Sequence, residues 1–125
     1  MILIYLYSSD ATVTVTVTGT NDQPVAGAVS INATEDGAAV TGSFTETDAD
    51  TADNHSFDIT SAPSEGSVVN NNDGTFTFDP GNDFQDLADG ETRDVSFTYT
   101  AIDDSGEPNA TSSAATVTVT VTGTN

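Results

Sequence analysis

The stretch ATVTVTVTGTN occurs twice in this chain of 125 residues, at positions 11–21 and again at 115–125. Within each copy Val alternates with Thr, which is the period of a β-strand that has one buried and one solvated face. The trailing GTN is repeated as well, and a chance recurrence of Thr-Val strands does not explain it. Identity over the whole stretch therefore indicates a tandem repeat.

The two copies also set the domain boundaries. Residues 22–125 are expected to form one complete repeat, and residues 11–21 to be the closing strand and linker of a preceding repeat. Residues 1–10 form an N-terminal segment outside the repeat. Its apolar start, MILIYLY at 1–7, is too short for a signal peptide or a membrane span, so we expect no membrane insertion.

Alternating patterns predict seven strands in the repeat, separated by Gly, Asp, Asn and Pro. Asn71-Asn72-Asp73-Gly74 is a strong hairpin turn, and a turn at 83–88 is expected to bring Phe84 and Leu87 over one end of the core. Short strands with polar outer faces predict an all-β, immunoglobulin-like antiparallel Greek-key sandwich. The seven strands are expected at 28–33, 40–47, 55–60, 66–70, 75–79, 93–102 and 115–122.

The charge of the chain excludes several functions. Asp and Glu number 20 against one Arg, which gives a formal net charge of −19. Nucleic acids and anionic membrane surfaces are therefore excluded as partners, whereas cations would be attracted. The absence of Cys excludes disulfides, thiolate zinc sites, iron–sulfur clusters and cysteine nucleophiles.

The acidic residues gather in loops at two opposite ends of the predicted sandwich, because successive strands alternate in direction. We call these the upper end and the lower end. The upper set comprises Asn21, Asp22, Asp48, Asp50, Asp53, Asp103 and Asp104. The lower set comprises Glu35, Asp36, Asp79, Asp83, Asp86 and Asp89.

Clustered carboxylates without a counter-ion repel one another, and calcium takes six to eight oxygen ligands from such loops. A generally acidic, solvated surface is the alternative; it accounts for the net charge but not for the clustering. The stretch DADTAD at 48–53 lacks the Gly and Glu of an EF-hand, and the calcium β-roll nonapeptide is absent. The sequence therefore predicts Ca²⁺ sites of another kind at the two ends.

Five motifs together resemble the VCBS, or bacterial cadherin-like, repeat, over about residues 11 to 125. They are GTNDQPV at 19–25, TEDG at 34–37, DADTAD at 48–53, NNNDGTFTFDPGNDFQDLADGE at 70–91 and SFTYTAIDDSG at 96–106. The resemblance implies an extender module in the tandem arrays of giant secreted RTX-type adhesins or filaments, at the bacterial cell surface. It also implies calcium between successive domains, which stiffens the rod.

The resemblance assigns ligand positions residue by residue. It matches Asn21 and Asp22 to the inter-domain linker, and Asp48 and Asp50 to a pair of aspartates. Glu35 matches a lone glutamate after the first strand, and Asp79, Asp83 and Asp86 occupy an acidic segment. Because the second copy stops at Asn125, no aspartate corresponds there to Asp22, so the lower site is expected to be incomplete.

The sequence also bears on two other function classes, enzymes and ligand-binding modules. Enzymatic activity is not expected, because Asp103 and Asp104 lie in polar loops rather than in an apolar pocket that would keep a general acid protonated. His55, at the start of a strand, is predicted to be a surface residue. A carbohydrate- or protein-binding sandwich module is the alternative, but the aromatic residues of the repeat fit core positions. That leaves Tyr5 and Tyr7 as aromatic residues outside the fold.

The expected partners are neighbouring copies of the same repeat, arranged head to tail. Residues 11–18 have the alternation of a strand, yet in this chain they have no sheet of their own. A strand with unpaired backbone groups tends to join an exposed edge. The segment could lie disordered, pair with an exposed edge, or be donated into the closing-strand position of a neighbouring molecule; of these, we expect pairing between molecules over disorder.

Overall fold

A computed structural model describes residues 8–125 of the chain; residues 1–7, with Tyr5 and Tyr7 and most of the predicted segment 1–10, lie outside the described residues. Within the described part the secondary structure consists of strands, and it contains no helix. The strands are β1 (Val25–Ala26), β2 (Val29–Thr34), β3 (Val40–Ser43), β4 (Glu46–Thr47), β5 (His55–Ser61), β6 (Ser67–Asn70), β7 (Thr75–Asp79), β8 (Thr92–Asp103) and β9 (Ala115–Thr122).

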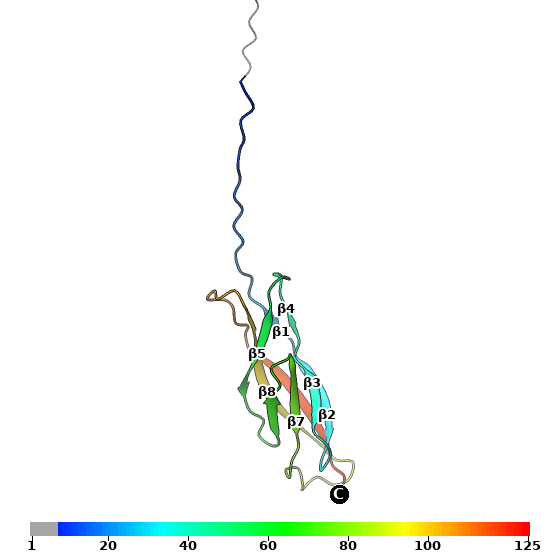
Figure 1. Ribbon diagram of the computed structural model, residues 1–125. Helices are drawn as coiled ribbons and strands as arrows, with labels where there is room; N and C mark the ends of the chain where they lie inside the picture. The colour runs from blue at the N-terminus through cyan, green and yellow to red at the C-terminus, as the bar shows by residue number, and fades with distance from the viewer. Residues whose placement is uncertain (1–7) are drawn as a thin grey trace, which may run out of the picture.

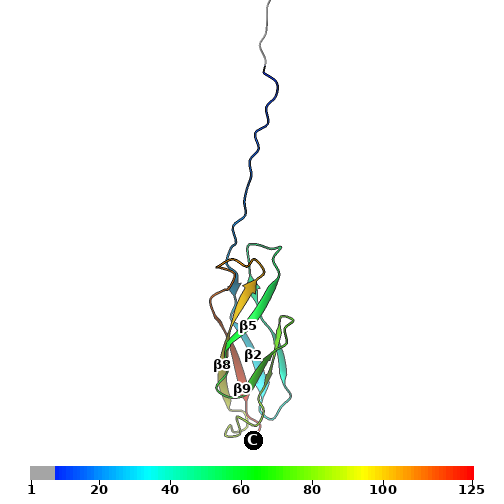
Figure 2. The same cartoon turned by 60° about the vertical axis from the view of Figure 1, so that its left-hand side comes forward.

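Two sheets face each other as a sandwich, as Figures 1 and 2 show. One sheet has the order β2-β9-β8-β5 and the other the order β3-β7-β6, while β1 and β4 form a separate two-stranded ribbon. Strands β2 and β9, β5 and β8, and β3 and β7 are neighbours although they are not consecutive in the chain, which is typical of the Greek-key arrangement of immunoglobulin-like domains. The predicted fold class is therefore confirmed.

The core lies between the inner faces of β8 and β9 and the sheet opposite them. Alternate residues of these strands are buried, as the period of two predicts, while the Thr residues between them face outward. β9 lies between β2 and β8, so its backbone is paired on both sides. The buried residues of the two strands are Val95, Phe97, Tyr99, Ala101, Val117, Val119 and Val121.

The sandwich departs from the predicted antiparallel pattern at one place. β2 pairs with β9 in parallel, from Val29↔Val117 to Thr34↔Thr122. The first and last of seven alternating strands run in the same direction, so they must pair in parallel when they become neighbours. The expectation of a purely antiparallel sandwich was wrong at this edge.

A second departure divides the predicted strand 40–47. β3 pairs with β7, but after the buried Phe44 the chain crosses over and β4 pairs with β1. The close packing of β3 on β7 depends on Gly42, since a Cβ there would lie 2.4 Å from the ring of Phe76. The break lets one continuous segment serve two sheets and reach the upper end.

The predicted turns are present. Asn72 and Gly74 have positive φ angles of 59° and 89° in the turn between β6 and β7. Phe84 and Leu87 are buried at one end of the core. Both local expectations are confirmed.

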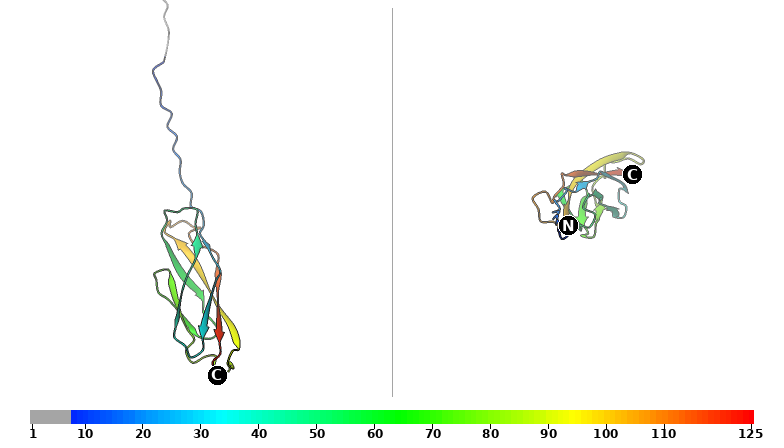
Figure 3. Two further views of the ribbon diagram at one scale, coloured as in Figure 1. Left: turned by 90° about the vertical axis from the view of Figure 1, so that its right-hand side faces the viewer. Right: turned by 90° about the horizontal axis from the view of Figure 1, so that it is seen from above.

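The first copy of the repeated stretch behaves differently from the second. Residues 11–18 form no strand, and Val13, Val15 and Val17 are 86%, 76% and 87% exposed. This segment, called the arm below, extends away from the upper end of the sandwich, and the C-terminus lies at the lower end (Figure 3). The two copies of GTN therefore mark opposite ends of the domain.

Candidate metal centre

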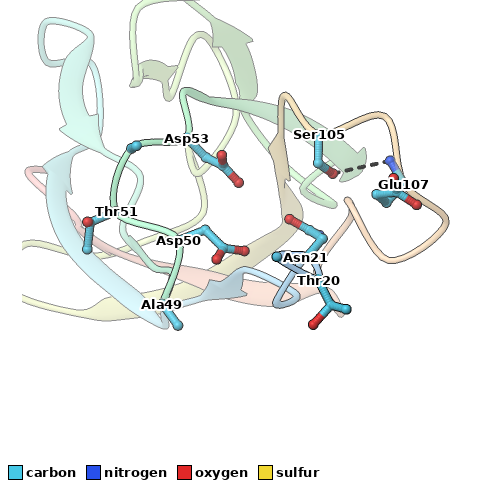
Figure 4. Close-up of a pocket in the computed structure, with 10 residues that line it drawn as sticks. Thr20, Asn21, Ala49, Asp50, Thr51, Asp53, Ser105 and Glu107 are labelled. Carbon is cyan, nitrogen blue, oxygen red and sulfur yellow. Dashed lines mark hydrogen bonds between the residues drawn. The ribbon is translucent and has the colours of Figure 1, made fainter. Parts of the chain in front are cut away.

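Three carboxylates of the predicted upper set lie together in the loop between β4 and β5. One oxygen each of Asp48, Asp50 and Asp53 falls within 4.8 Å of the others, and residues 8–125 contain no other such group of three metal-ligating side chains. Figure 4 shows Asp50 and Asp53 projecting from this loop toward the side on which Asn21 lies. The geometry thus supplies convergent hard oxygen ligands at the upper end.

Local hydrogen bonds give the loop its shape. The side-chain oxygen Oδ1 of Asp48 accepts the N–H of Asp50 at 2.8 Å, and the carbonyl of Asp50 accepts the N–H of Asp53 at 3.0 Å. Asp side chains commonly cap their own backbone two residues on in this way. Alternate spacing of Asp48 and Asp50 therefore turns the chain tightly enough to bring both carboxylates to one side.

The incoming linker completes the upper end. The N–H of Asp22 donates to Oδ2 of Asp50 at 2.7 Å. Nδ2 of Asn21 donates to Oδ1 of Asn109 at 2.9 Å, and Nδ2 of Asn109 donates to the backbone carbonyl of Asn21 at 2.8 Å. A shallow hollow of about 530 Å³ lies between the linker, the Asp50–Asp53 loop and Ser105. Linker, loop and the β8–β9 connection therefore border one open space.

Asp103 brings a buried carboxylate to the same end. It is the last residue of β8 and only 5% exposed; its Oδ1 accepts the N–H and hydroxyl of Ser105, while its Oδ2 has no hydrogen-bond partner. The bonds from Ser105 hold the pKa of Asp103 below its ordinary value despite burial. Asp103 is thus a buried carboxylate that keeps one oxygen without a donor.

Asp53 also has a buried oxygen without a hydrogen-bond partner, Oδ2, and so has Glu46 in β4, Oε2. Burial raises the pKa of Asp53, and the negative charges of Asp103, Asp104 and Asp50 raise it further. Asp104 bonds to the same loop: its Oδ1 accepts the backbone N–H of Asn54 and its Oδ2 accepts the side-chain amide of Asn54, each at 3.2 Å. The upper end therefore carries charge repulsion that Arg93, paired with Asp86 and Glu65, does not relieve.

The prediction for His55 was wrong, since its side chain is only 13% exposed. Its Nε2 lies 2.8 Å from Oδ2 of Asp48 and 3.6 Å from Oε2 of Glu46. Because a carboxylate only accepts, Nε2 donates to Asp48, and this bond raises the pKa of His55 against the lowering effect of burial. The alternation of His55 with Phe57 and Ile59 placed it on the inward face, a signal that the sequence analysis missed.

At the lower end Glu35 is the most buried acidic residue, 1% exposed. Its Oε1 accepts the N–H of Thr124 at 2.7 Å and that of Asn125 at 3.1 Å, while its Oε2 has no partner. Nδ2 of Asn125 in turn donates to the carbonyls of Gln85 and Leu87. Glu35 therefore holds the second GTN at the lower end of the domain.

Four of the other lower carboxylates each accept hydrogen bonds from a different group of the protein. Asp36 accepts from Gln85, Asp79 from the N–H of Gly81, and Asp83 from the N–H of Gly66. Asp86 makes a bidentate ion pair with Arg93, which also contacts Glu65 at 3.0 Å. The N–H of Asp89 donates to the carbonyl of Asn125. Unlike the upper set, these side chains do not converge on one point.

Comparison with known families agrees with this architecture. The family model described as "Bacterial cadherin-like domain" matches residues 21–123. The chain belongs to this family. A search of curated proteins and of solved structures finds no match to the bacterial cadherin-like chain.

Membership of the bacterial cadherin-like family carries general properties. Such domains are typically non-enzymatic structural modules, are usually extracellular and generally bind Ca²⁺. Residues 8–125 include no helix with the length and apolarity that crossing a membrane requires. The ligand roles of the upper and lower sets remain predictions, because family membership does not assign them to individual residues.

Proposed function

We propose that this domain is a calcium-stiffened extender module of a tandem-repeat bacterial surface adhesin or filament, secreted and spacing an adhesive tip from the cell. The observation that carries the proposal is the convergence of Asp48, Asp50 and Asp53 within 4.8 Å at the end where the linker enters. A cation bound there would join the linker to the domain. An extender needs that property if it is to resist bending.

The donor set fits calcium. All three converging groups are carboxylates, and Asp103 adds a buried oxygen without a donor. A buried charge without a compensating partner is costly, and a bound divalent cation compensates it. Calcium would supply charge neutralisation and a rigid cross-link between loops. The residues that would hold it are Asp48, Asp50, Asp53 and Asp103, with Asn21 and Asp22 from the linker.

Tandem arrangement is supported by the two copies of the repeated stretch. In a preceding domain, residues 11–21 would take the place that the second copy takes in this one: a strand paired on both sides, followed by a GTN held by Glu35. The arm leaves the upper end and the C-terminus lies at the lower end. Successive copies would therefore meet lower end to upper end, and Glu35 of one copy would lie beside the linker to the next.

The arm also supports a contact between separate molecules of this chain. Its Val residues are exposed, whereas the same residues in β9 are fully buried. Burying them would gain hydrophobic stabilisation, and the receptor would be the β9 position or a free sheet edge of a second molecule. Entry into the β9 position releases an identical strand, so we expect such exchange to be weak and concentration-dependent.

A two-repeat chain tests the spacer role. Two copies of residues 22–125 joined in tandem should show a larger and narrower distribution of maximum dimensions by small-angle X-ray scattering with calcium than with a chelator. The matched control carries Asp50→Asn in the second copy, whose loop faces the linker, and should stay flexible in both conditions. The same distribution with and without calcium would contradict the extender role.

A further inference from the structure

Tyr99 places a polar group inside the apolar core. It lies on the inner face of β8, is fully buried, and its ring packs 4.6 Å from the ring of Phe44. A buried phenol hydroxyl requires hydrogen-bond partners, since an unpaired one is costly. The hydrogen-bond partners of this hydroxyl therefore indicate which segments of the chain Tyr99 holds in place.

The hydroxyl closes a ring of three hydrogen bonds with Gly27 and Thr45. The N–H of Gly27 donates to the carbonyl of Thr45 at 3.0 Å, and the N–H of Thr45 donates to the Tyr99 hydroxyl at 3.2 Å. The hydroxyl contacts the carbonyls of both Gly27 and Thr45. A phenol carries one proton. Because the carbonyl of Thr45 already accepts from Gly27, we assign this proton to the carbonyl of Gly27.

This ring extends the ribbon formed by β1 and β4. The ribbon has only two backbone pairs, Val25↔Thr47 and Ala26↔Glu46, and Gly27 and Thr45 would form the next pair. The phenol oxygen stands between the N–H of Thr45 and the carbonyl of Gly27, in place of a direct ladder bond. A two-stranded ribbon of this length is marginal by itself, so the Tyr99 hydroxyl is its anchor to the main sheet.

The anchored ribbon leads directly into the candidate metal centre. Asp48 is the residue after β4, and Asp22 lies three residues before β1, where its N–H meets Asp50 at 2.7 Å. β8 continues from Tyr99 to Asp103, four residues further. The three segments that bring carboxylates to the upper end therefore meet at one hydroxyl in the core.

We propose that Tyr99 is a positioning residue for the metal centre: its hydroxyl holds the β1–β4 ribbon against β8 and thereby sets Asp48 and Asp50 opposite Asp103. This inference rests on the proposed calcium function. It means that Tyr99, which is not one of the proposed ligands, contributes to the calcium affinity. A role confined to folding would lower the melting temperature and leave the affinity of the folded protein unchanged.

The test compares Tyr99→Phe with Val121→Ala in the full chain. Val121 is fully buried and pairs with Ala33 and Arg93, toward the lower end, so its truncation weakens the core without touching the ribbon. Calcium affinity is measured by calorimetric titration well below both melting temperatures. We expect the dissociation constant to rise about tenfold in Tyr99→Phe, corresponding to the loss of about one buried hydrogen bond, and to stay unchanged in Val121→Ala.

A second variant keeps the test decisive if Tyr99→Phe does not fold. A Cβ at Gly27 would lie 2.4 Å from Oγ1 of Thr45, so Gly27→Ala forces the Thr45 side chain to shift beside the Tyr99 hydroxyl, and we expect it to weaken calcium binding with Tyr99 intact. Wild-type affinity in Tyr99→Phe, or in Gly27→Ala, would overturn the inference, and so would equal losses in Tyr99→Phe and Val121→Ala. Failure of the wild-type chain to bind calcium would instead refute the proposed function, and the role of Tyr99 with it.

Discussion

The two ends of this sandwich carry similar numbers of acidic residues but use them differently. At the upper end Asp48, Asp50 and Asp53 converge, and Glu46, Asp53 and Asp103 each have one buried oxygen without a hydrogen-bond donor. At the lower end the carboxylates are spread over backbone N–H groups, one amide side chain and Arg93. Because Glu35 at the lower end also has one oxygen without a donor, the difference between the ends is the convergence of three carboxylates on one point, and this convergence, rather than the number of carboxylates, indicates a cation site.

The largest expected effect is loss of calcium binding when the upper end is changed. Asp50→Asn should raise the calcium dissociation constant by about tenfold or more, because it removes a charged ligand without changing shape. Glu35→Gln, the corresponding change at the lower end, should leave the constant unchanged in this chain. Calorimetric titration measures both, and Asp58→Asn on the exposed face of β5 controls for the lost charge.

The reverse order would break the comparison. If Glu35→Gln weakened calcium binding more than Asp50→Asn did, the lower end would be the cation site. If Asp58→Asn weakened it as much as Asp50→Asn, calcium would be responding to net charge rather than to a site.

The second-largest expected effect is a loss of folding stability when Glu35 at the lower end is changed. Glu35→Ala removes the acceptor of two backbone N–H groups in a buried position, which costs about 1–3 kcal/mol. Glu35→Gln keeps an acceptor and should lose less. Urea unfolding without calcium measures both variants, and equal losses would show that the hydrogen bonds to Thr124 and Asn125 contribute nothing.

A smaller effect is expected from Arg93, the one permanent cation in the chain. Its ion pairs with Asp86 and Glu65 are partly exposed, so Arg93→Met should lower the melting temperature less than Glu35→Ala does. Calcium affinity at the upper end should not change. A loss of affinity equal to that of Asp50→Asn would show that the two ends are coupled.

The ion pair also has a defined pH dependence. The hydrogen bond from Arg93 lowers the pKa of Asp86, so the folded state favours the ionised carboxylate. The stabilisation is therefore present above the ordinary pKa of Asp, about 3.9, and is lost as the pH falls through the lower folded value. The difference in stability between wild type and Arg93→Met should accordingly disappear in acid, and a constant difference would contradict this origin.

The smallest effect on stability should come from deleting residues 1–18. The arm makes no strand pairing, so its removal should leave the melting temperature unchanged. It should reduce concentration-dependent assembly, which light scattering with calcium present would detect. A full chain that stays monomeric at millimolar concentration would show that the arm donates no strand.

Strands and core residues were predictable from the sequence because alternation reports burial directly. Val117, Val119 and Val121 follow a strict period of two, and all are buried. The break after β3 was not predictable, because Phe44 and Thr45 continue the alternation of a strand. At the break the N–H of Thr45 donates to the hydroxyl of Tyr99, which lies more than fifty residues away in the chain.

The candidate site was predictable to the level of the end but not of the individual contact. Alternating strand direction places Asp48, Asp50 and Asp103 at one end, and the structure brings them there. Direction alone does not say which carboxylates find donors: Asp104 turns to Asn54, and Asp86 turns to Arg93. These choices depend on single side-chain neighbours, which a repeating pattern does not encode.

The most direct test of the central claim is thermal unfolding in calcium chloride and in sodium chloride at equal ionic strength. With a dissociation constant of about 10⁻⁴–10⁻³ M, calcium at a hundred times that value should add about 2.7 kcal/mol to the free energy of unfolding. The melting temperature should rise more with calcium than with sodium, and Asp50→Asn should lose this difference. Equal rises in the two salts would contradict a specific calcium site at the upper end and leave only charge screening.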